Sequence, residues 1–347
     1  VAGLTLALEK YGTISLERAL QPAIELAKNG FPVDHEFIKS LGYAKNRMEK
    51  SPASMEIFYK ENGETYKEGE LITQKDLAWS LKQIADNGPQ AFYDGEIAKK
   101  ISSFMKQHGG LITSQDLKTY KAFTRKPIEG NYRGYEIYSM PPPSSGGVHL
   151  IQMLNILEQF PLSSFSHNTA KTIHILAETM KHAYADRSKH LGDPDFFPIP
   201  VSGLTSKKYA ESLKEQINMK RATPSSEILP GDPTTYEGMN TTHFSVMDSK
   251  GNAVSNTYTL NFSYGSKITV PGTGILLNNE MDDFSAKPGS PNAYGLVGGR
   301  LNAIAPEKRM LSSMSPTIVM KDGNPFLVTG SPGGSRIITT VLQIILN

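Results

Sequence analysis

Apolar side chains in the first two-thirds of the chain recur mostly at the spacing of α-helices. One such stretch can begin after Ser15, whose hydroxyl suits a helix N-cap, and stop at Gly30, a residue that favours helix ends. Its repeating apolar positions are Leu16, Leu20, Ala23 and Ala27. Further helices are predicted at 76–85, 96–107 and 169–190, the last with Ile173, Leu176, Met180 and Ala183 on one face. This part of the chain therefore predicts a layer of helices.

Strand signals are concentrated in the last third of the chain. Residues 242–247 and 253–260 alternate apolar and polar side chains, and turn-forming residues separate them, so the pattern predicts a β-hairpin. Further strands are predicted at 135–138, 317–320 and 326–328. The glycine-rich segment 330–335 then leads from a strand into a final helix at 336–346. Helices followed by a sheet and another helix predict a layered α/β fold.

Two connecting segments bear on function. Residues 141–147, Pro-Pro-Pro-Ser-Ser-Gly-Gly, lie between the strand at 135–138 and a helix that begins near Leu150. Residues 223–238 are rich in proline, serine, threonine and glycine and form the best linker candidate. An exposed linker of this kind is open to cleavage.

Composition narrows the function by exclusion. The 36 basic and 34 acidic residues nearly cancel, so no overall field favours nucleic acid or a membrane surface. The absence of cysteine excludes thiol catalysis, zinc–thiolate sites and disulfides. The histidines of the helix at 169–190 do not face one point, so no metal site is predicted. Because the chain starts without methionine and its last helix has no cap, we expect it to be truncated at both ends.

Asn240-Thr241-Thr242 stands at the mouth of a predicted strand, directly after the linker. Threonine is a poor nucleophile, but cleavage before Thr241 would free its α-amino group to act as the base. The alternative is that these threonines simply begin a strand, since β-branched residues favour strands.

Three more segments could take part in chemistry. The backbone amides of 330–335 could form an oxyanion hole or bind an anion, or the segment could be a plain strand-to-helix turn. The acidic segment 278–283 suits an ammonium group or calcium, or is a solvated turn. Ser312 and Ser313 could donate to a carboxylate, or could belong to an ordinary loop.

Together, these segments resemble the γ-glutamyltransferase (γ-glutamyltranspeptidase) family, in the same order and across nearly the whole chain. The resemblance is carried by 241–246, 257–261, 276–283, 309–317 and 329–336, and upstream by 140–147, 184–187 and 191–195. It implies an αββα sandwich, the N-terminal-nucleophile hydrolase fold with a helical large-subunit portion. It also implies a precursor that cleaves itself between Asn240 and Thr241, into portions 1–240 and 241–347.

The resemblance assigns a role to each site residue. Thr241 would be the nucleophile, oriented by Thr259, and the amides of Gly333 and Gly334 would form the oxyanion hole. The substrate ammonium group would be bound by Asn261, Glu280 and Asp283, and its α-carboxylate by Ser312 and Ser313. Tyr294 would belong to a lid loop at 288–299, as in bacterial members of the family. An arginine of the family that pairs with the α-carboxylate would precede Val1.

The implied activity is hydrolysis or transfer of γ-glutamyl groups from glutathione and similar amides, with water, an amino acid or a peptide as acceptor. No metal or organic cofactor is implied. The implied partners are the two subunits formed by self-cleavage, and the implied location is exported, either periplasmic or secreted. Two alternatives stay open: a related acylase for glutaryl-cephalosporin or poly-γ-glutamate, and a fragment that does not process itself and only binds ligands.

Overall fold

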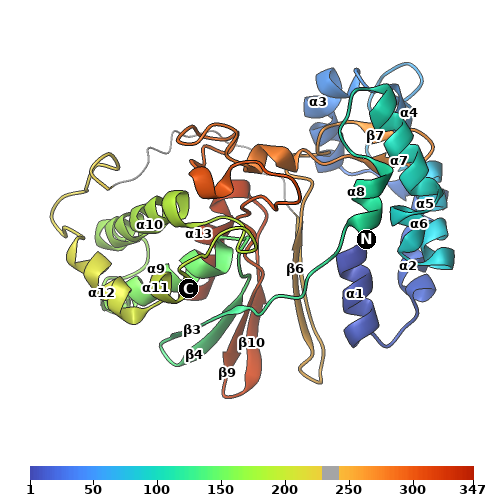
Figure 1. Cartoon of the computed structure of the whole chain (residues 1–347). Helices are drawn as coiled ribbons and strands as arrows, with labels where there is room; N and C mark the ends of the chain where they lie inside the picture. Colours follow the sequence, from blue (N-terminus) through green and yellow to red (C-terminus); the bar gives the residue numbers. More distant parts are fainter. Residues whose placement is uncertain (229–241) are drawn as a thin grey trace. The chain divides into compact units, whose positions relative to one another are not determined.

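The computed structural model describes residues 1–228 and 242–347 (Figure 1). They form two compact units, each assembled from segments that are far apart in the sequence. Unit 1 consists of Val1–Thr124 and Ser263–Asn278, and unit 2 of Arg125–Phe262 and Asn279–Asn347. In the described ranges, no helix is both long and apolar enough to cross a membrane.

Unit 1 is mainly helical. Its helices are α1 (Ala2–Tyr11), α2 (Leu16–Asn29), α3 (His35–Met48), α4 (Pro52–Phe58), α5 (Lys75–Asn87), α6 (Gln90–Tyr93), α7 (Glu96–Gln107) and α8 (Ser114–Thr119). Two short antiparallel strand pairs join them: β1 (Phe31–Pro32) with β2 (Leu71–Ile72), and β7 (Thr269–Val270) with β8 (Ile275–Leu276). Ser54 Oγ lies 2.9 Å from both Thr269 Oγ1 and Lys267 O, so the later segment is packed into this unit.

The helices predicted in unit 1 are confirmed, because their ends carry strong local signals. In α2, Ser15 Oγ accepts a hydrogen bond from Arg18 N at 3.2 Å. At the other end Gly30, with φ of 86°, donates its N–H to Leu26 O at 2.9 Å. Helices α5 and α7 cover the other two predicted ranges.

Unit 2 contains a four-stranded antiparallel sheet with helices on one side (Figure 1). In the order β10–β9–β4–β3, its strands are β10 (Asn324–Thr329), β9 (Thr317–Lys321), β4 (Tyr135–Ser139) and β3 (Ile128–Tyr132). The buried helix α9 (Gly146–Leu157) packs against β3 and β4. Around it lie α10 (Ala170–His190), α11 (Val201–Leu204), α12 (Lys207–Glu215) and α13 (Ile337–Leu346). Helix α9 is thus the centre of this layer.

A hairpin formed by β5 (Thr242–Met247) and β6 (Ala253–Tyr258) packs against β9 and β10. Ser255 Oγ joins the two layers, since it donates to Thr329 O at 2.8 Å and accepts from Thr317 N at 3.0 Å. Helices, sheet and hairpin therefore form the layered α/β arrangement that the sequence predicts. Short 3₁₀ helices are η1 (Leu162–Ser164), η2 (Glu280–Asp283), η3 (Arg300–Asn302) and η4 (Gly334–Arg336).

Three predictions about unit 2 need correction. The strand expected at 253–260 ends at Tyr258, and the helix expected near Leu150 already begins at Gly146. Ile173, expected to share one apolar face of α10 with Ala183, is 53% exposed although Ala183 is buried, because the buried face of that helix runs through Ile175 and Thr179. Most of the predicted linker 223–238 lies outside the described residues.

Truncating Ile156 to alanine should destabilise unit 2 far more than truncating Ile173. Both isoleucines are helical, but Ile156 in α9 is fully buried, so Ile156→Ala leaves a cavity and should cost about 2 to 5 kcal/mol. Ile173→Ala should cost less than about 1 kcal/mol. Urea unfolding of the two variants measures the difference, and equal losses would contradict this packing.

Candidate functional site

Most of the predicted site residues line one pocket in unit 2. They are Thr259, Asn261, Asp283, Tyr294, Ser312, Ser313 and Gly334, and Leu296, Met314 and Ile337 complete the wall. Glu280 stands on the same 3₁₀ helix as Asp283, and Gly333 directly precedes Gly334. The pocket volume is about 20 Å³, which leaves room for little more than one water molecule.

The end of β6 is shaped by hydrogen bonds that replace strand pairing. Asn261 has a left-handed backbone, with φ of 74°, and its N–H donates to Thr259 Oγ1 at 2.8 Å. The Asn261 side chain donates to Asn279 O at 3.1 Å, and Phe262 N donates to Asn279 Oδ1 at 3.0 Å. This turn ends the strand and places Thr259 and Asn261 in the pocket wall beside the start of η2.

Glu280 and Asp283 both belong to η2, and the pKa values of their carboxyl groups are raised. Burial, together with the neighbouring Asp283, raises the pKa of Glu280 to about 7. Burial also raises the pKa of Asp283 to about 7, although the Arg187 guanidinium works in the opposite direction. A cation bound here would stabilise both carboxylates, so the pair is suited to an ammonium group.

Ser312 and Ser313 lie in a loop that is joined to the segment before α9. Ser312 N donates to Pro143 O, and Ser145 N donates to Ser312 O, both at 2.9 Å. Ser144 Oγ donates to Met314 O at 2.7 Å. These bonds hold the serine loop against the proline-rich segment 141–147.

Arg187 belongs to this site, although its sequence position did not predict it. It lies on α10, and its guanidinium donates to Ser145 Oγ at 3.0 Å and to Ser313 Oγ at 3.2 Å. An arginine near the end of a helix suggests an exposed residue, yet Arg187 is only 4% exposed. The segment 184–187 was part of the family resemblance, and it is the sequence signal that could have identified Arg187.

The glycine turn between β10 and α13 has backbone angles that favour glycine. Gly333 has φ of 131° and Gly334 has φ of 52°, so a side chain at either position would be strained. Tyr184 of α10 donates its hydroxyl to Ser335 O. Helix α10 therefore contacts both the glycine turn and, through Arg187, the serine loop.

Tyr294 closes the pocket. Its hydroxyl donates to Asn261 O at 2.5 Å, and its ring is so close to Gly334 that a Cβ there would lie 2.6 Å from ring atoms. In the same loop, Asn292 Nδ2 donates to Asp283 Oδ1 at 3.3 Å. The predicted lid loop is thus held by groups of the pocket itself.

Asn240 and Thr241, the predicted cleavage site and nucleophile, lie outside the described residues. The next residue, Thr242, begins β5 and pairs with Tyr258 of β6. Tyr258 directly precedes Thr259 of the pocket wall.

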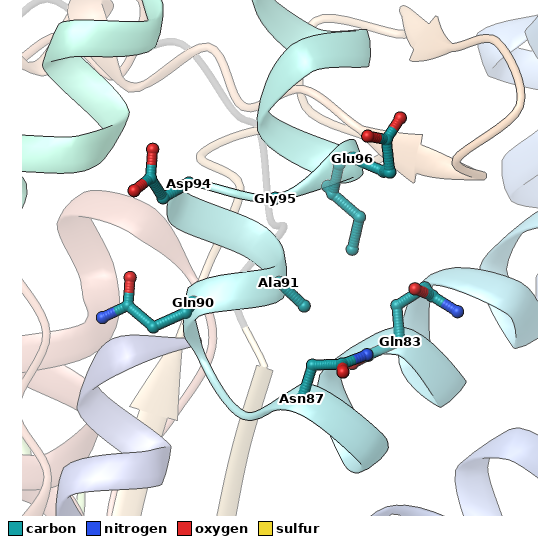
Figure 2. A pocket seen from close by; sticks show the side chains of 8 residues that line it. Gln83, Asn87, Gln90, Ala91, Asp94, Gly95 and Glu96 are labelled. Atoms are coloured by element: carbon teal, nitrogen blue, oxygen red, sulfur yellow. The ribbon is translucent and has the colours of Figure 1, made fainter.

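A more open groove in unit 1 contains none of the predicted site residues (Figure 2). It lies among α5, α6 and α7, has a volume of about 480 Å³, and is lined by Gln83, Asn87, Gln90, Ala91, Asp94, Gly95, Glu96 and Ile97. Its acidic side chains are paired with lysines, Asp94 with Lys118 and Glu96 with Lys99. The groove is therefore distinct from the pocket that holds the predicted site residues.

Comparison with known proteins decides the family. A model described as Gamma-glutamyltranspeptidase matches residues 1–347. The chain belongs to the gamma-glutamyltranspeptidase family. A curated relative, the glutathione hydrolase proenzyme of Escherichia coli (strain K12), is 56% identical over 348 residues, which cover 100% of this chain and 60% of the relative.

Solved structures of the family and of an acylase share the fold, an N-terminal-nucleophile hydrolase fold as predicted. The cephalosporin acylase from Bacillus halodurans has a TM-score of 0.85 and 29% identity, covering 100% of this chain and 61% of that one. The gamma-glutamyltranspeptidase of Helicobacter pylori has a TM-score of 0.65 and 46% identity, covering 69% of this chain and 68% of that one. The chain spans about 60% of the length of the curated family members it matches.

Replacing Asp283 with asparagine should make folding less sensitive to pH between about 4 and 7. Folding raises the pKa of this carboxyl from 3.8 to about 7, so its contribution to stability is fully present below the unfolded pKa and is lost as pH rises through this window. Asp283→Asn removes that loss. Relative to the wild type it should gain about 1 to 2 kcal/mol across the window, after allowance for partial exposure.

Urea unfolding of both proteins at about pH 4, 5.5 and 8 gives this difference. A constant offset added to this pH-dependent difference is compatible with the account, because the variant also changes the contact with Asn292. A difference that does not change with pH would show that Asp283 titrates normally in the folded protein.

Proposed function

We propose that the protein is a self-processing γ-glutamyltransferase and glutathione hydrolase. The observation that carries this proposal is one pocket whose wall combines the acidic Asp283, two serine hydroxyls and a glycine turn. The wall of this pocket includes Thr259, which directly follows the residue paired with Thr242. Membership of the gamma-glutamyltranspeptidase family supports the same activity.

The pocket groups match the two ends of a glutamyl zwitterion. Asn261, Glu280 and Asp283 offer acceptors for the α-ammonium group, and Ser312 and Ser313 offer hydroxyl donors for the α-carboxylate. Recognition of both charges would orient the γ-carbonyl toward the nucleophile, and such positioning is a large part of catalysis. A substrate that lacks either charge would be held less firmly.

The proposed reaction proceeds through a γ-glutamyl ester on Thr241. Cleavage of the Asn240–Thr241 peptide bond frees the Thr241 amine, which takes the proton of its own hydroxyl while Thr259 orients that hydroxyl. The oxygen attacks the γ-carbonyl, and the N–H groups of Gly333 and Gly334 stabilise the oxyanion. The leaving amine takes the proton as the C–N bond breaks. Water, an amino acid or a peptide amine then cleaves the ester by the same steps in reverse.

Tyr294 would have to move before a glutamyl group can enter, because the closed pocket holds little more than one water molecule. We therefore assign the loop around Tyr294 the role of a lid. Closure over the ester would exclude water and lengthen the life of the intermediate.

The residues placed in the pocket require no metal or cofactor for this chemistry. The partners of the reaction are glutathione or another γ-glutamyl compound and the acceptor amine. Portions 1–240 and 241–347 would act as paired large and small subunits after cleavage. Export to the periplasm or the medium stays a prediction from the family resemblance.

A second candidate is an acylase with a glutaryl substrate, favoured by the structural similarity to a cephalosporin acylase. A glutaryl group has no ammonium, so it would bring no positive charge to the partly buried carboxyl groups of Glu280 and Asp283. The acidic pair therefore favours the glutamyl substrate.

Thr241→Ala should abolish both self-cleavage and turnover of γ-glutamyl-p-nitroanilide, because it removes the only hydroxyl at the proposed nucleophile. Thr242→Ala, its neighbour at the start of β5, is the matched control and should still be cleaved. Intact mass and N-terminal sequencing follow cleavage, and absorbance follows turnover. Cleavage or turnover in Thr241→Ala would assign the nucleophile to another residue.

The preference for γ-glutamyl over glutaryl p-nitroanilide should increase as pH rises through about 7, since both acidic groups then become carboxylates. The ratio of the two kcat/KM values isolates this effect, because steps common to both substrates cancel. Asp283→Asn should reduce the ratio by roughly tenfold or more. A ratio that is constant with pH and unchanged in Asp283→Asn would favour the acylase alternative.

A further inference from the structure

Arg187 is a buried cation beside the candidate pocket. The residue is 4% exposed, and its guanidinium forms no ion pair with any residue that the structure describes. Its hydrogen bonds go to the hydroxyl groups of Ser145 and Ser313. A buried charge without an ionic partner is costly, so packing alone does not account for an arginine here.

The guanidinium fixes the direction of both hydroxyl groups. Arginine is only a donor, so Ser145 Oγ and Ser313 Oγ both accept in these contacts, and each hydroxyl hydrogen must point elsewhere. Ser145 donates its hydrogen to Ser312 O at 2.8 Å. Within the described ranges, the Ser313 hydroxyl has no acceptor of its own, and Ser313 lines the pocket. Its hydrogen is therefore available to a ligand in the pocket.

The same hydrogen bonds place the positive charge of Arg187 next to the serine loop. An anion that accepts from Ser313 Oγ would lie one hydroxyl group away from the guanidinium, which stays protonated in proteins. Asp283 is the carboxylate whose charge acts on Arg187, but its hydrogen bond is to Asn292 of the lid loop. The positive charge of Arg187 is thus directed at the serine side of the pocket.

We propose that Arg187 is a positioning residue for the α-carboxylate of the substrate. It holds the Ser313 hydroxyl as a donor into the pocket and supplies positive charge behind it, without touching the substrate. This inference rests on the proposed function, because it assumes a ligand whose carboxylate lies at Ser312 and Ser313.

Arginine suits this position better than lysine. The planar guanidinium reaches Ser145 with Nε and Ser313 with Nη2, whereas an ammonium group would have to satisfy both serines from one nitrogen. Glutamine retains a polar group but removes the charge. The series arginine, lysine, glutamine therefore separates charge from geometry.

The test compares two substrates that differ only in the α-carboxylate, γ-glutamyl-p-nitroanilide and γ-aminobutyryl-p-nitroanilide. Arg187→Gln should raise KM for the glutamyl substrate by roughly tenfold to a hundredfold, with kcat much less affected. KM for the aminobutyryl substrate should change by less than about twofold. Arg187→Lys should give an intermediate KM for the glutamyl substrate.

Tyr184→Phe is the matched control for a purely structural role. Tyr184 also ties α10 to the site, through Ser335 O, but it carries no charge. Its loss should affect both substrates equally. If Arg187→Gln also affects both substrates equally, Arg187 only supports the fold, and the proposal is wrong.

Calorimetry on Thr241→Ala gives the same comparison without turnover, with L-glutamate and γ-aminobutyrate as ligands. If Arg187→Gln does not fold, Arg187→Lys decides: an unchanged ratio of the two ligand affinities overturns the proposal. A wild-type protein that does not distinguish the two anilides would overturn the proposed function itself. Discrimination by the wild type that persists in Arg187→Gln overturns only the role of Arg187.

Discussion

The candidate site depends on the hydrogen bonds between the segment 141–147 and the serine loop 312–314. These segments are more than 160 residues apart in sequence, yet Ser144 donates to Met314 O and Ser145 donates to Ser312 O. The approach is so close that a Cβ on Gly146 would lie 2.2 Å from Met314 O. The buried helix α9 begins here, so the serine loop is held at the start of a helix whose residues are all buried.

This arrangement keeps charges close together before any substrate is bound. Burial raises the pKa of both Glu280 and Asp283, and Arg187 is buried without an ion pair among the described residues. A zwitterionic ligand would stabilise both sets of charges. Its ammonium group would lie at the carboxyl groups, and its carboxylate would lie at the serines next to Arg187. In the closed state, lid residues Asn292 and Tyr294 bond to Asp283 and Asn261 instead.

Local sequence signals predicted elements where short-range effects dominate. Helix α2 has both a Ser15 cap and a Gly30 stop, and hairpin β5–β6 has turn-forming residues between its two strands. Predictions were wrong where tertiary contacts override pattern. The predicted strand at 253–260 ends early because the side chains of Thr259 and Asn279 satisfy the backbone beyond it. Ile173 is exposed because the neighbours of α10, rather than its own periodicity, determine which face is buried.

Most residues of the site were predicted from the family resemblance rather than from local sequence patterns. Thr259, Asn261, Asp283, Ser312, Ser313 and Gly334 were named from family resemblance, and the fold brings them to one pocket. Arg187 was not assigned a role, since sequence alone gives no sign that this charged residue of α10 is buried against two serines.

The most direct test of the central claim is a crystal structure of the Thr241→Ala protein with L-glutamate bound. The account predicts glutamate in the unit 2 pocket, with its ammonium group at Asn261 and Asp283, its α-carboxylate at Ser312 and Ser313, and Tyr294 displaced. Glutamate bound in the reverse orientation, or only in the groove of unit 1, would contradict it.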